Sequence, residues 1–281
     1  MIRRLDGQLQ GAYRTVFRGT GIDFADLRTY TPDDDVRHID WNVTARMDEP
    51  YVRQYTQDRD LTAWLVCDRS ASMRFGAPDH GKDSVGADLA VCLARLLTQT
   101  GNRVGAILYD HRSQRIVPPR TGRNHVLLLT HELTQAATSP ADGRRTDLDA
   151  MLRLAASTAR RRSLIFVISD FIGDVDWEPA LTRLGHRHEV VAVRVVDPIE
   201  IDLPDVGLVV IEDAETGEQL LADTGDPLFQ QRLRAEVQAR EVAVASSMRR
   251  AGATAYRVGT DDDLIATLID MVRRSKRRRR A

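Results

Sequence analysis

Two short apolar runs that each end in an aspartate constrain the fold of this chain more than any other feature. Residues 61–67 read LTAWLVC and lead into Asp68, and residues 163–169 read SLIFVIS and lead into Asp170. Apolar runs of this length are typical of strands buried on both faces of a sheet. They predict a sheet between layers of helix, with both carboxylates at strand ends.

Strand-like and helix-like segments alternate along the rest of the chain. Val85, Leu89, Cys92 and Leu96 recur at helical spacing, and Pro118 and Pro119 limit a short edge strand. Further strands are expected at 104–110, 190–196 and 254–260, and further helices at 124–137, 148–161, 177–184, 227–250 and 262–273. Strands separated by helices predict an α/β fold with a mainly parallel sheet and right-handed crossovers.

The expected organisation is one main domain with additions. We place the domain at residues 60–272, with a probable β-hairpin insertion at 198–226, where GLVVIEDAETGEQLLAD turns at Thr216-Gly217. Seven of the 40 basic residues lie at 273–281, which we expect to be a disordered basic tail. Contact of this tail with nucleic acid or membrane is the less favoured alternative, because no aromatic residues accompany it.

Residues 1–59 do not fit the alternation, and we expect an irregular or β-rich segment packed on the main domain. A strand over Tyr51 to Tyr55 is expected near the sheet edge. Trp41 is expected to be a buried anchor. Arg37, Asp40 and Arg46 could form a buried polar network, or a surface for a partner.

Oxygen-bearing side chains gather at the predicted strand ends. Asp68, Ser70 and Ser72 form D-x-S-x-S, Thr146 precedes a helix, and Asp170 follows a strand. The first motif alone is weak, because residue frequencies produce it by accident in roughly one chain in ten of this length. Open α/β sheets bind ligands at such strand ends, and hard divalent cations prefer oxygen ligands. Together the three segments predict a metal site.

These five residues resemble the metal-ion-dependent adhesion site of the von Willebrand factor A fold. The resemblance implies a doubly wound, Rossmann-like sheet in the order 3-2-1-4-5-6, with Asp68 and Asp170 at the point where the winding reverses. It also implies that Ser70, Ser72 and Thr146 bind the metal directly, and that the aspartates act largely through water. Mg²⁺ suits these ligands best, Mn²⁺ or Ca²⁺ are alternatives, and an open position would accept an Asp or Glu of another protein.

The region upstream resembles the bacterial domain-of-unknown-function 58 family, whose signature joins R-x-Y, D-x-R-x-I-D-W and A-R. The matching residues are Arg28, Tyr30, Asp35, Arg37, Ile39, Asp40, Trp41, Ala45 and Arg46. The resemblance implies an adaptor that acts with a MoxR-type AAA+ ATPase on a client complex. Many members are thought to carry membrane helices before this region, whereas we expect this chain to be a free, cytoplasmic version.

The sequence disfavours enzymatic alternatives. A magnesium-dependent phosphohydrolase could use Asp68 and Asp170, but hydroxyl ligands dominate, and we expect no lysine or histidine near a leaving phosphate. Ser70 lacks the G-x-S-x-G setting of a nucleophile, and the chain has no G-x-x-x-x-G-K-[ST] phosphate loop. We therefore predict a non-catalytic, metal-dependent protein-interaction domain.

Overall fold

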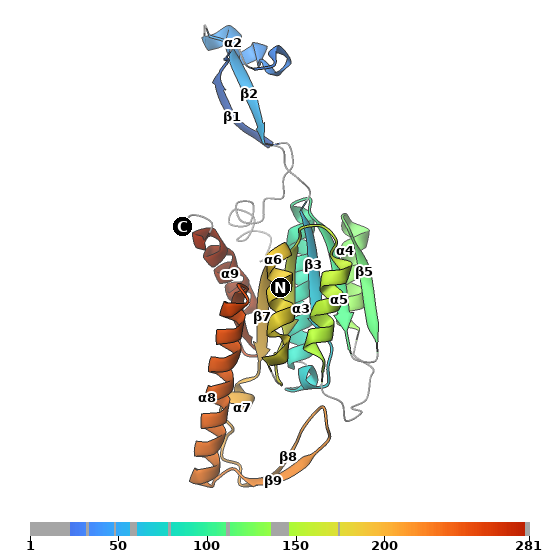
Figure 1. Ribbon diagram of the computed structural model, residues 1–281, viewed down its shortest axis with the longest axis vertical. Helices are drawn as coiled ribbons and strands as arrows, with labels where there is room; N and C mark the ends of the chain where they lie inside the picture. The colour runs from blue at the N-terminus through green and yellow to red at the C-terminus, as the bar shows by residue number, and fades with distance from the viewer. Residues whose placement is uncertain are drawn as a thin grey trace.

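A six-stranded sheet forms the centre of the computed structural model, which describes residues 23–31, 34–47, 49–56, 61–77, 80–110, 113–135, 146–173 and 175–278 (Figure 1). The strand order is β10-β7-β6-β3-β4-β5, and every neighbouring pair is parallel except β4 and β5. The strands are β3 (Thr62–Asp68), β4 (Arg103–Tyr109), β5 (Gln114–Arg120), β6 (Leu164–Ser169), β7 (Glu189–Val196) and β10 (Thr254–Gly259).

The predicted sheet topology is confirmed. With β3 counted as the first strand of the domain, the observed order is 3-2-1-4-5-6, so β3 and β6 are neighbours and the winding reverses between them. The edge strand β5 contains Pro118 and Pro119, as expected, since a proline cannot donate a ladder hydrogen bond and is tolerated at an edge.

Helices cover both faces of the sheet, because side chains of each strand alternate between two cores. In β3, Ala63, Leu65 and Cys67 pack into one core, and Trp64 and Val66 into the other. The first core is closed by α3 (Lys82–Gln99), α4 (Arg123–Thr134) and α9 (Leu264–Arg278), and the second by α5 (Leu148–Thr158), α6 (Glu178–Arg187) and α8 (Pro227–Arg250). Each fully buried Leu or Val contributes about 1.5–3 kcal/mol.

The predicted hairpin insertion is present as an antiparallel pair, β8 (Leu208–Glu212) and β9 (Gln219–Asp223), preceded by the short helix α7 (Pro198–Ile201). Gly217 in its turn has φ 73°, a conformation that favours glycine. In Figure 1 the chain enters β3 at the upper end of the sheet, so the strands that carry Asp68 and Asp170 end at the lower end, beneath which the hairpin passes.

Helix α9 is longer than the sequence pattern predicts. We expected a helix to Arg273 followed by a disordered tail, whereas the helix continues to Arg278. Arginine and lysine have high helix propensity, and no glycine or proline interrupts the run. The expected boundary at residue 273 is therefore not a boundary of secondary structure.

The described part of residues 1–59 forms a small separate unit. Strands β1 (Asp23–Thr29) and β2 (Tyr51–Thr56) pair antiparallel, and between them lie a 3-10 turn, η1 (Val36–His38), and the helix α2 (Trp41–Met47). The strand expected over Tyr51 to Tyr55 exists, but it pairs with β1 and not with the main sheet. In Figure 1 the unit lies beyond one end of the sheet, and its packing on the main domain stays a prediction.

The expected burial of Trp41 and the buried network of Arg37, Asp40 and Arg46 are wrong, whereas a partner surface at these residues stays a prediction. Trp41 is 68% exposed, so it is not a buried anchor. Arg37 is exposed and pairs with Asp35, and the buried Asp40 accepts the N–H of Asn42 at the start of α2. These bonds are local because a two-stranded hairpin with a seven-residue helix has too little second layer to bury a tryptophan or an ionic network.

Candidate metal centre and its rim

The loop after β3 brings the first three predicted ligands together. Asp68, Ser70 and Ser72 are 3%, 3% and 8% exposed. The Oδ1 atom of Asp68 accepts the N–H of Ser70 at 2.9 Å, and the Oγ atoms of Ser70 and Ser72 lie 3.0 Å apart. The 3-10 turn η2 (Ser72–Arg74) begins at once. One carboxylate and two hydroxyls are thus held in a compact, buried loop.

Strand β6 delivers Asp170 beside this loop. Because β6 pairs with β3 and Cys67 lies level with Ile168, the two strands end next to each other. The hydroxyl of Ser169 donates to Oδ2 of Asp68 at 2.7 Å, which joins the strand ends directly. Asp170 is 2% exposed, and its Oδ1 accepts the N–H of Ile172 at 3.1 Å. Four of the five predicted ligands therefore belong to one buried neighbourhood.

Lys82, which we did not predict, also belongs to this neighbourhood. Its side chain is fully buried, and its Nζ lies 2.7 Å from Oδ2 of Asp170 and 2.6 Å from Oε1 of Glu200 in α7. We expected no lysine placed to stabilise a leaving phosphate; Lys82, the first residue of α3, does lie beside Asp170, but its ammonium already bonds two carboxylates. A signal was available, since Lys82 is one of only two lysines among 40 basic residues.

Burial and neighbouring charges shift the pKa values of two carboxylates in this neighbourhood. The pKa of Asp68 is raised to about 7, first by burial and then by the charge of Asp170, while hydrogen bonds from Ser169 and Ser70 oppose the shift. Burial likewise raises the pKa of Glu200, although Lys82 opposes it. The ammonium of Lys82 bonds two of these carboxylates, Asp170 and Glu200, and an added cation would stabilise the ionised form of Asp68.

Thr146, the fifth predicted ligand, is held by a different residue. It lies two positions before α5, and its N–H and Oγ1 donate to Oε2 and Oε1 of Glu215 at 2.9 and 2.6 Å. Glu215 stands in the turn between β8 and β9, and sequence analysis missed it, although this turn is rich in acidic residues. A carboxylate of the chain itself therefore occupies the hydrogen-bonding groups of Thr146.

Thr146 nevertheless lies at the same end of the sheet as the other ligands. Tyr109 is level with Asp68 in the ladder. The pKa of Tyr109 is raised mainly by burial and then by the charges of Asp147, Asp68 and Asp110. Asp147, which precedes α5, and Asp68 therefore both lie near Tyr109, so the start of α5 faces the same strand ends. We call Asp68, Ser70, Ser72, Asp170, Lys82 and Glu200 the floor of the site, and Thr146 with Glu215 its rim.

The donors present fit a hard divalent cation. Hydroxyl and carboxylate oxygens suit Mg²⁺, which usually takes only one or two carboxylates and keeps several waters. No group of three or more His, Cys, Asp or Glu that could hold a metal occurs within the described ranges, so a soft-metal site has no candidate there. A cation bound at Asp170 would have to share this carboxylate with the ammonium of Lys82.

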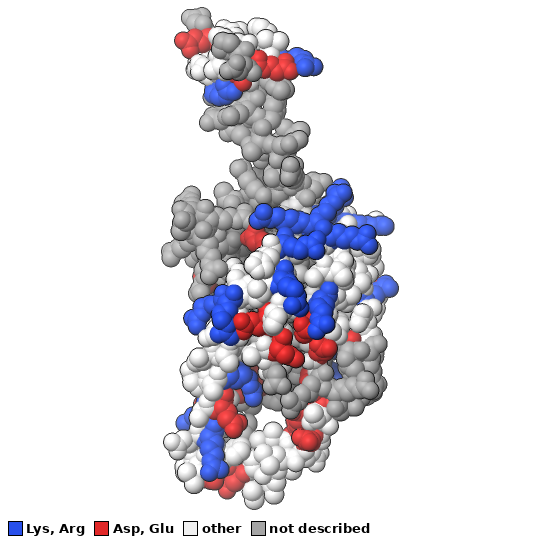
Figure 2. Space-filling model, viewed as in Figure 1, with Lys and Arg blue, Asp and Glu red and all other residues white. Residues whose placement is uncertain are grey.

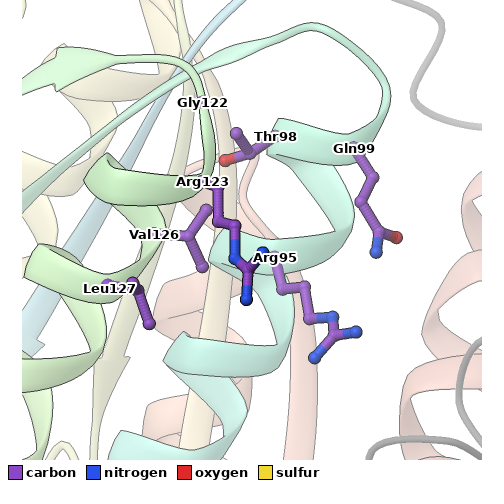
Figure 3. A pocket seen from close by; sticks show the side chains of 7 residues that line it. All are labelled: Arg95, Thr98, Gln99, Gly122, Arg123, Val126 and Leu127. Carbon is purple, nitrogen blue, oxygen red and sulfur yellow. The ribbon is translucent and has the colours of Figure 1, made fainter.

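Other hollows of the surface lie outside the floor. A groove of about 480 Å³ runs between α3 and α4, with Arg95 and Arg123 on its two sides (Figure 3). A second, of about 420 Å³, begins at Arg69, next to Asp68, and is lined by Asp110 and Glu132 among others. None of the five predicted ligands lines either hollow. The space-filling view shows basic side chains gathered at the upper end of the main domain, away from the strand ends (Figure 2).

Comparison with known proteins gives a family and a fold. The model of the family described as "Protein of unknown function DUF58" matches residues 26–243. An uncharacterised protein of Mycobacterium bovis is 37% identical over 275 residues, which cover 98% of this chain and 86% of the relative.

A solved structure with a TM-score of 0.50 shares the fold at low sequence identity. An aerotolerance-related membrane protein from Bacteroides fragilis has a TM-score of 0.50 and 15% identity, covering 78% of this chain and 99% of that one. The conserved hypothetical protein BatB from Bacteroides thetaiotaomicron has a TM-score of 0.47 and 12% identity, covering 77% and 99%. Within the part of this chain that the structure describes, none of the helices has the length and apolar character that crossing a bilayer requires.

Proposed function

Because this chain belongs to the DUF58 family, and its sheet has the von Willebrand factor A-like order, we propose that it is a non-catalytic, metal-dependent protein-interaction protein. The fold suggests an interaction role. The finer proposal is that the protein holds a divalent cation at the floor and binds an acidic side chain of a partner there.

The observation that carries the proposal is the meeting of Asp68 and Asp170 at the switch point of the sheet. Both carboxylates are nearly inaccessible, and the pKa of Asp68 is raised to about 7 by burial and by its neighbour. Buried like charges are costly unless a cation or further donors compensate them. Hydroxyls of Ser70 and Ser72 complete a set of hard oxygen donors beside them.

Mg²⁺ is the proposed cation, with Mn²⁺ or Ca²⁺ as alternatives. Its ligands would be Asp68, Ser70, Ser72 and Asp170 of the floor and Thr146 of the rim, whose Oγ1 donates its proton to Glu215 and keeps oxygen lone pairs for a cation. When bound, it would supply a positive centre that attracts a carboxylate. Lys82 keeps Asp170 in place from the side of α3, because its ammonium bonds both Asp170 and Glu200. The chain's own residues therefore orient the ligands, and the partner supplies the missing acid.

The position of Lys82 favours binding over phosphoryl chemistry. A lysine that stabilises a phosphate must present its ammonium to the substrate. Lys82 is fully buried and already bonds two carboxylates at 2.7 and 2.6 Å. We therefore keep the interaction role as the proposed function.

The proposed partners follow from the family resemblance. We propose a MoxR-type AAA+ ATPase, together with a client protein that presents an Asp or Glu, and we propose that they meet in the cytoplasm. The acidic side chain would be the hot spot of the contact, since removing one partner of a buried charge pair leaves the other charge buried and unpaired.

Affinity capture tests this function. The tagged protein is incubated with a lysate of its own source in Mg²⁺, in EDTA, and as the variant Ser70→Ala/Ser72→Ala in Mg²⁺, and captured proteins are quantified by mass spectrometry. The proposal predicts an AAA+ ATPase or its client that is retained in Mg²⁺ and lost in both other conditions. Ser113→Ala, outside the floor, is the matched control and should retain it.

Partners that are captured equally in all conditions would contradict metal dependence. Hydrolysis of a generic phosphoester in Mg²⁺ that Asp68→Ala abolishes would instead favour an enzyme.

A further inference from the structure

The contact between Thr146 and Glu215 has the form of a ligand in a binding site. Both carboxylate oxygens of Glu215 are engaged, one by a backbone N–H at 2.9 Å and the other by a hydroxyl at 2.6 Å. Hydrogen bonds to a carboxylate are stronger than those between neutral groups. The two residues are 69 positions apart in sequence, so the contact is tertiary and not a local turn.

The position of Thr146 suits an anion for a second reason. It stands immediately before Asp147, which caps the eleven-residue helix α5 by accepting the N–H of Ala150 at 2.8 Å. The start of a helix carries partial positive charge, and its backbone N–H groups bind carboxylates and phosphates. Any carboxylate that reaches Thr146 meets the same N–H, hydroxyl and helix dipole as Glu215 does.

The hairpin that carries Glu215 has few other restraints near its tip. Among the described residues its two strands pair with each other alone, and Leu208, Val210, Leu220 and Leu221 are 71%, 60%, 60% and 67% exposed, whereas Ala222 near the base is buried. An isolated two-stranded hairpin is only marginally stable in water. The Thr146 contact therefore has a large share in fixing where the turn lies.

The base and the turn of the hairpin are ordered, in contrast to its open faces. At the base, the buried Thr224 bonds both Val206 and Gly207 through its hydroxyl. In the turn, Oδ1 of Asp213 accepts the N–H groups of Glu215 and Thr216 at 2.8 and 2.9 Å. The turn can therefore leave Thr146 as a preformed unit while the base stays in place.

We infer that Thr146 is a carboxylate-binding site whose internal occupant is Glu215, and that an acidic side chain of a partner binds it by displacing Glu215. The inference rests on the proposed function only for the visitor being a protein side chain. The number of hydrogen bonds does not change, because the carboxylate of Glu215 leaves the N–H and hydroxyl of Thr146 as the partner's carboxylate takes its place. The hairpin is released in the same step.

Competition sets the expected affinities. A tethered carboxylate acts at an effective concentration in the millimolar range, so a free carboxylate binds the intact protein only after it outcompetes Glu215. If Glu215 is bound to Thr146 in about 90% or more of the molecules, its removal tightens the apparent affinity for a free carboxylate by about 10-fold or more.

The amide resonance of Thr146 in a ¹H–¹⁵N NMR spectrum reports the contact directly. Sodium acetate is titrated in EDTA into the wild type, Glu215→Gln and the matched control Glu218→Gln, which alters an exposed carboxylate of the same turn. Sodium chloride at equal ionic strength controls for salt. We expect Glu215→Gln to move the Thr146 amide upfield, and acetate to move it back with an apparent Kd about 10-fold below that of the wild type. Glu218→Gln should behave as the wild type does.

A second variant keeps the test decisive. Thr146→Ala retains the backbone N–H but loses the hydroxyl, so combined with Glu215→Gln it should weaken acetate binding by about 5- to 10-fold. The inference is overturned if the Thr146 amide ignores Glu215→Gln, or if acetate affects all variants equally.

Repeating the titration in Mg²⁺ with Asp68→Asn separates the inference from the proposed function. An acetate response at Thr146, together with no Mg²⁺ binding by the wild type, supports the Thr146 site and contradicts only the metal-dependent function. Binding of Mg²⁺ that depends on Asp68, together with a silent Thr146 amide, would overturn only the inference.

Discussion

The floor and the rim of the site are built from similar chemical groups but are held in different ways. In the floor, Lys82, Asp68 and Asp170 are at most 3% exposed, and each takes part in a bond of 2.6 to 2.7 Å between elements far apart in sequence. In the rim, Thr146 and Glu215 are half-buried and meet through one side chain on an exposed hairpin. The floor is suited to keep its side chains in fixed positions, and the rim is suited to exchange one carboxylate for another.

Removal of the floor's ammonium should have the largest effect. Lys82→Met leaves Asp170 and Glu200 without their common partner, and breaking a buried ion pair on one side costs about 3–5 kcal/mol. Urea unfolding measures the loss of unfolding free energy. Arg115→Met, which breaks the exposed pair with Glu132, is the control and should cost about 0–1 kcal/mol. Equal losses in the two variants would remove the distinction between floor and surface.

The second-largest effect is expected in the pH dependence of the unfolding free energy, which depends on Asp68 in the floor. The folded pKa of Asp68 is raised to about 7, above the value near 3.9 of an unfolded chain, so the folded state binds the proton more tightly. This contribution is present at low pH and is lost as pH rises from about 4 to about 7. In EDTA, the wild type should lose unfolding free energy over this window relative to Asp68→Asn. Parallel curves for the two proteins would show that Asp68 titrates normally.

Disruption of the rim should cost much less than disruption of the floor. Glu215→Ala removes two hydrogen bonds of half-buried groups and should lower the unfolding free energy by about 1 kcal/mol, while hydrogen exchange of residues 208–223 accelerates. Glu218→Ala should change neither quantity. A loss as large as that of Lys82→Met would mean that the rim is structural and cannot exchange its ligand.

The smallest effect is expected outside the site, at Trp41. Because its side chain is 68% exposed, Trp41→Ala should change the unfolding free energy by less than about 0.5 kcal/mol. A buried anchor would instead cost about 3–5 kcal/mol. Differential scanning calorimetry distinguishes these values, and the larger loss would place Trp41 in a core.

The sequence predicted what local patterns and the family resemblance encode. Apolar runs and helical spacing identified the strands and helices of the sheet, and the resemblance supplied their order, so the meeting of Asp68 with Asp170 followed from topology. The hairpin was found from its turn residues. Thr146 was placed correctly before a helix, although its partner was not foreseen.

The contacts that sequence analysis missed are tertiary ion pairs and hydrogen bonds. Lys82 meets Asp170 and Glu200 across 88 and 118 residues, and Thr146 meets Glu215 across 69. No periodicity encodes such pairs, because they depend on how loops end after the sheet has formed. The error at Trp41 has the opposite cause: an aromatic residue was assumed to be buried, although the unit around it lacks a second layer.

Binding of Mn²⁺ to metal-stripped protein tests the central claim most directly. Electron paramagnetic resonance counts free Mn²⁺ during a titration of the wild type and of Ser70→Ala/Ser72→Ala. We predict one bound ion per wild-type chain, displaced by Mg²⁺, and at least a 10-fold weaker affinity in the variant, because two direct oxygen ligands are lost. Equal binding by both proteins, or none by the wild type, would contradict a cation site at the ends of β3 and β6.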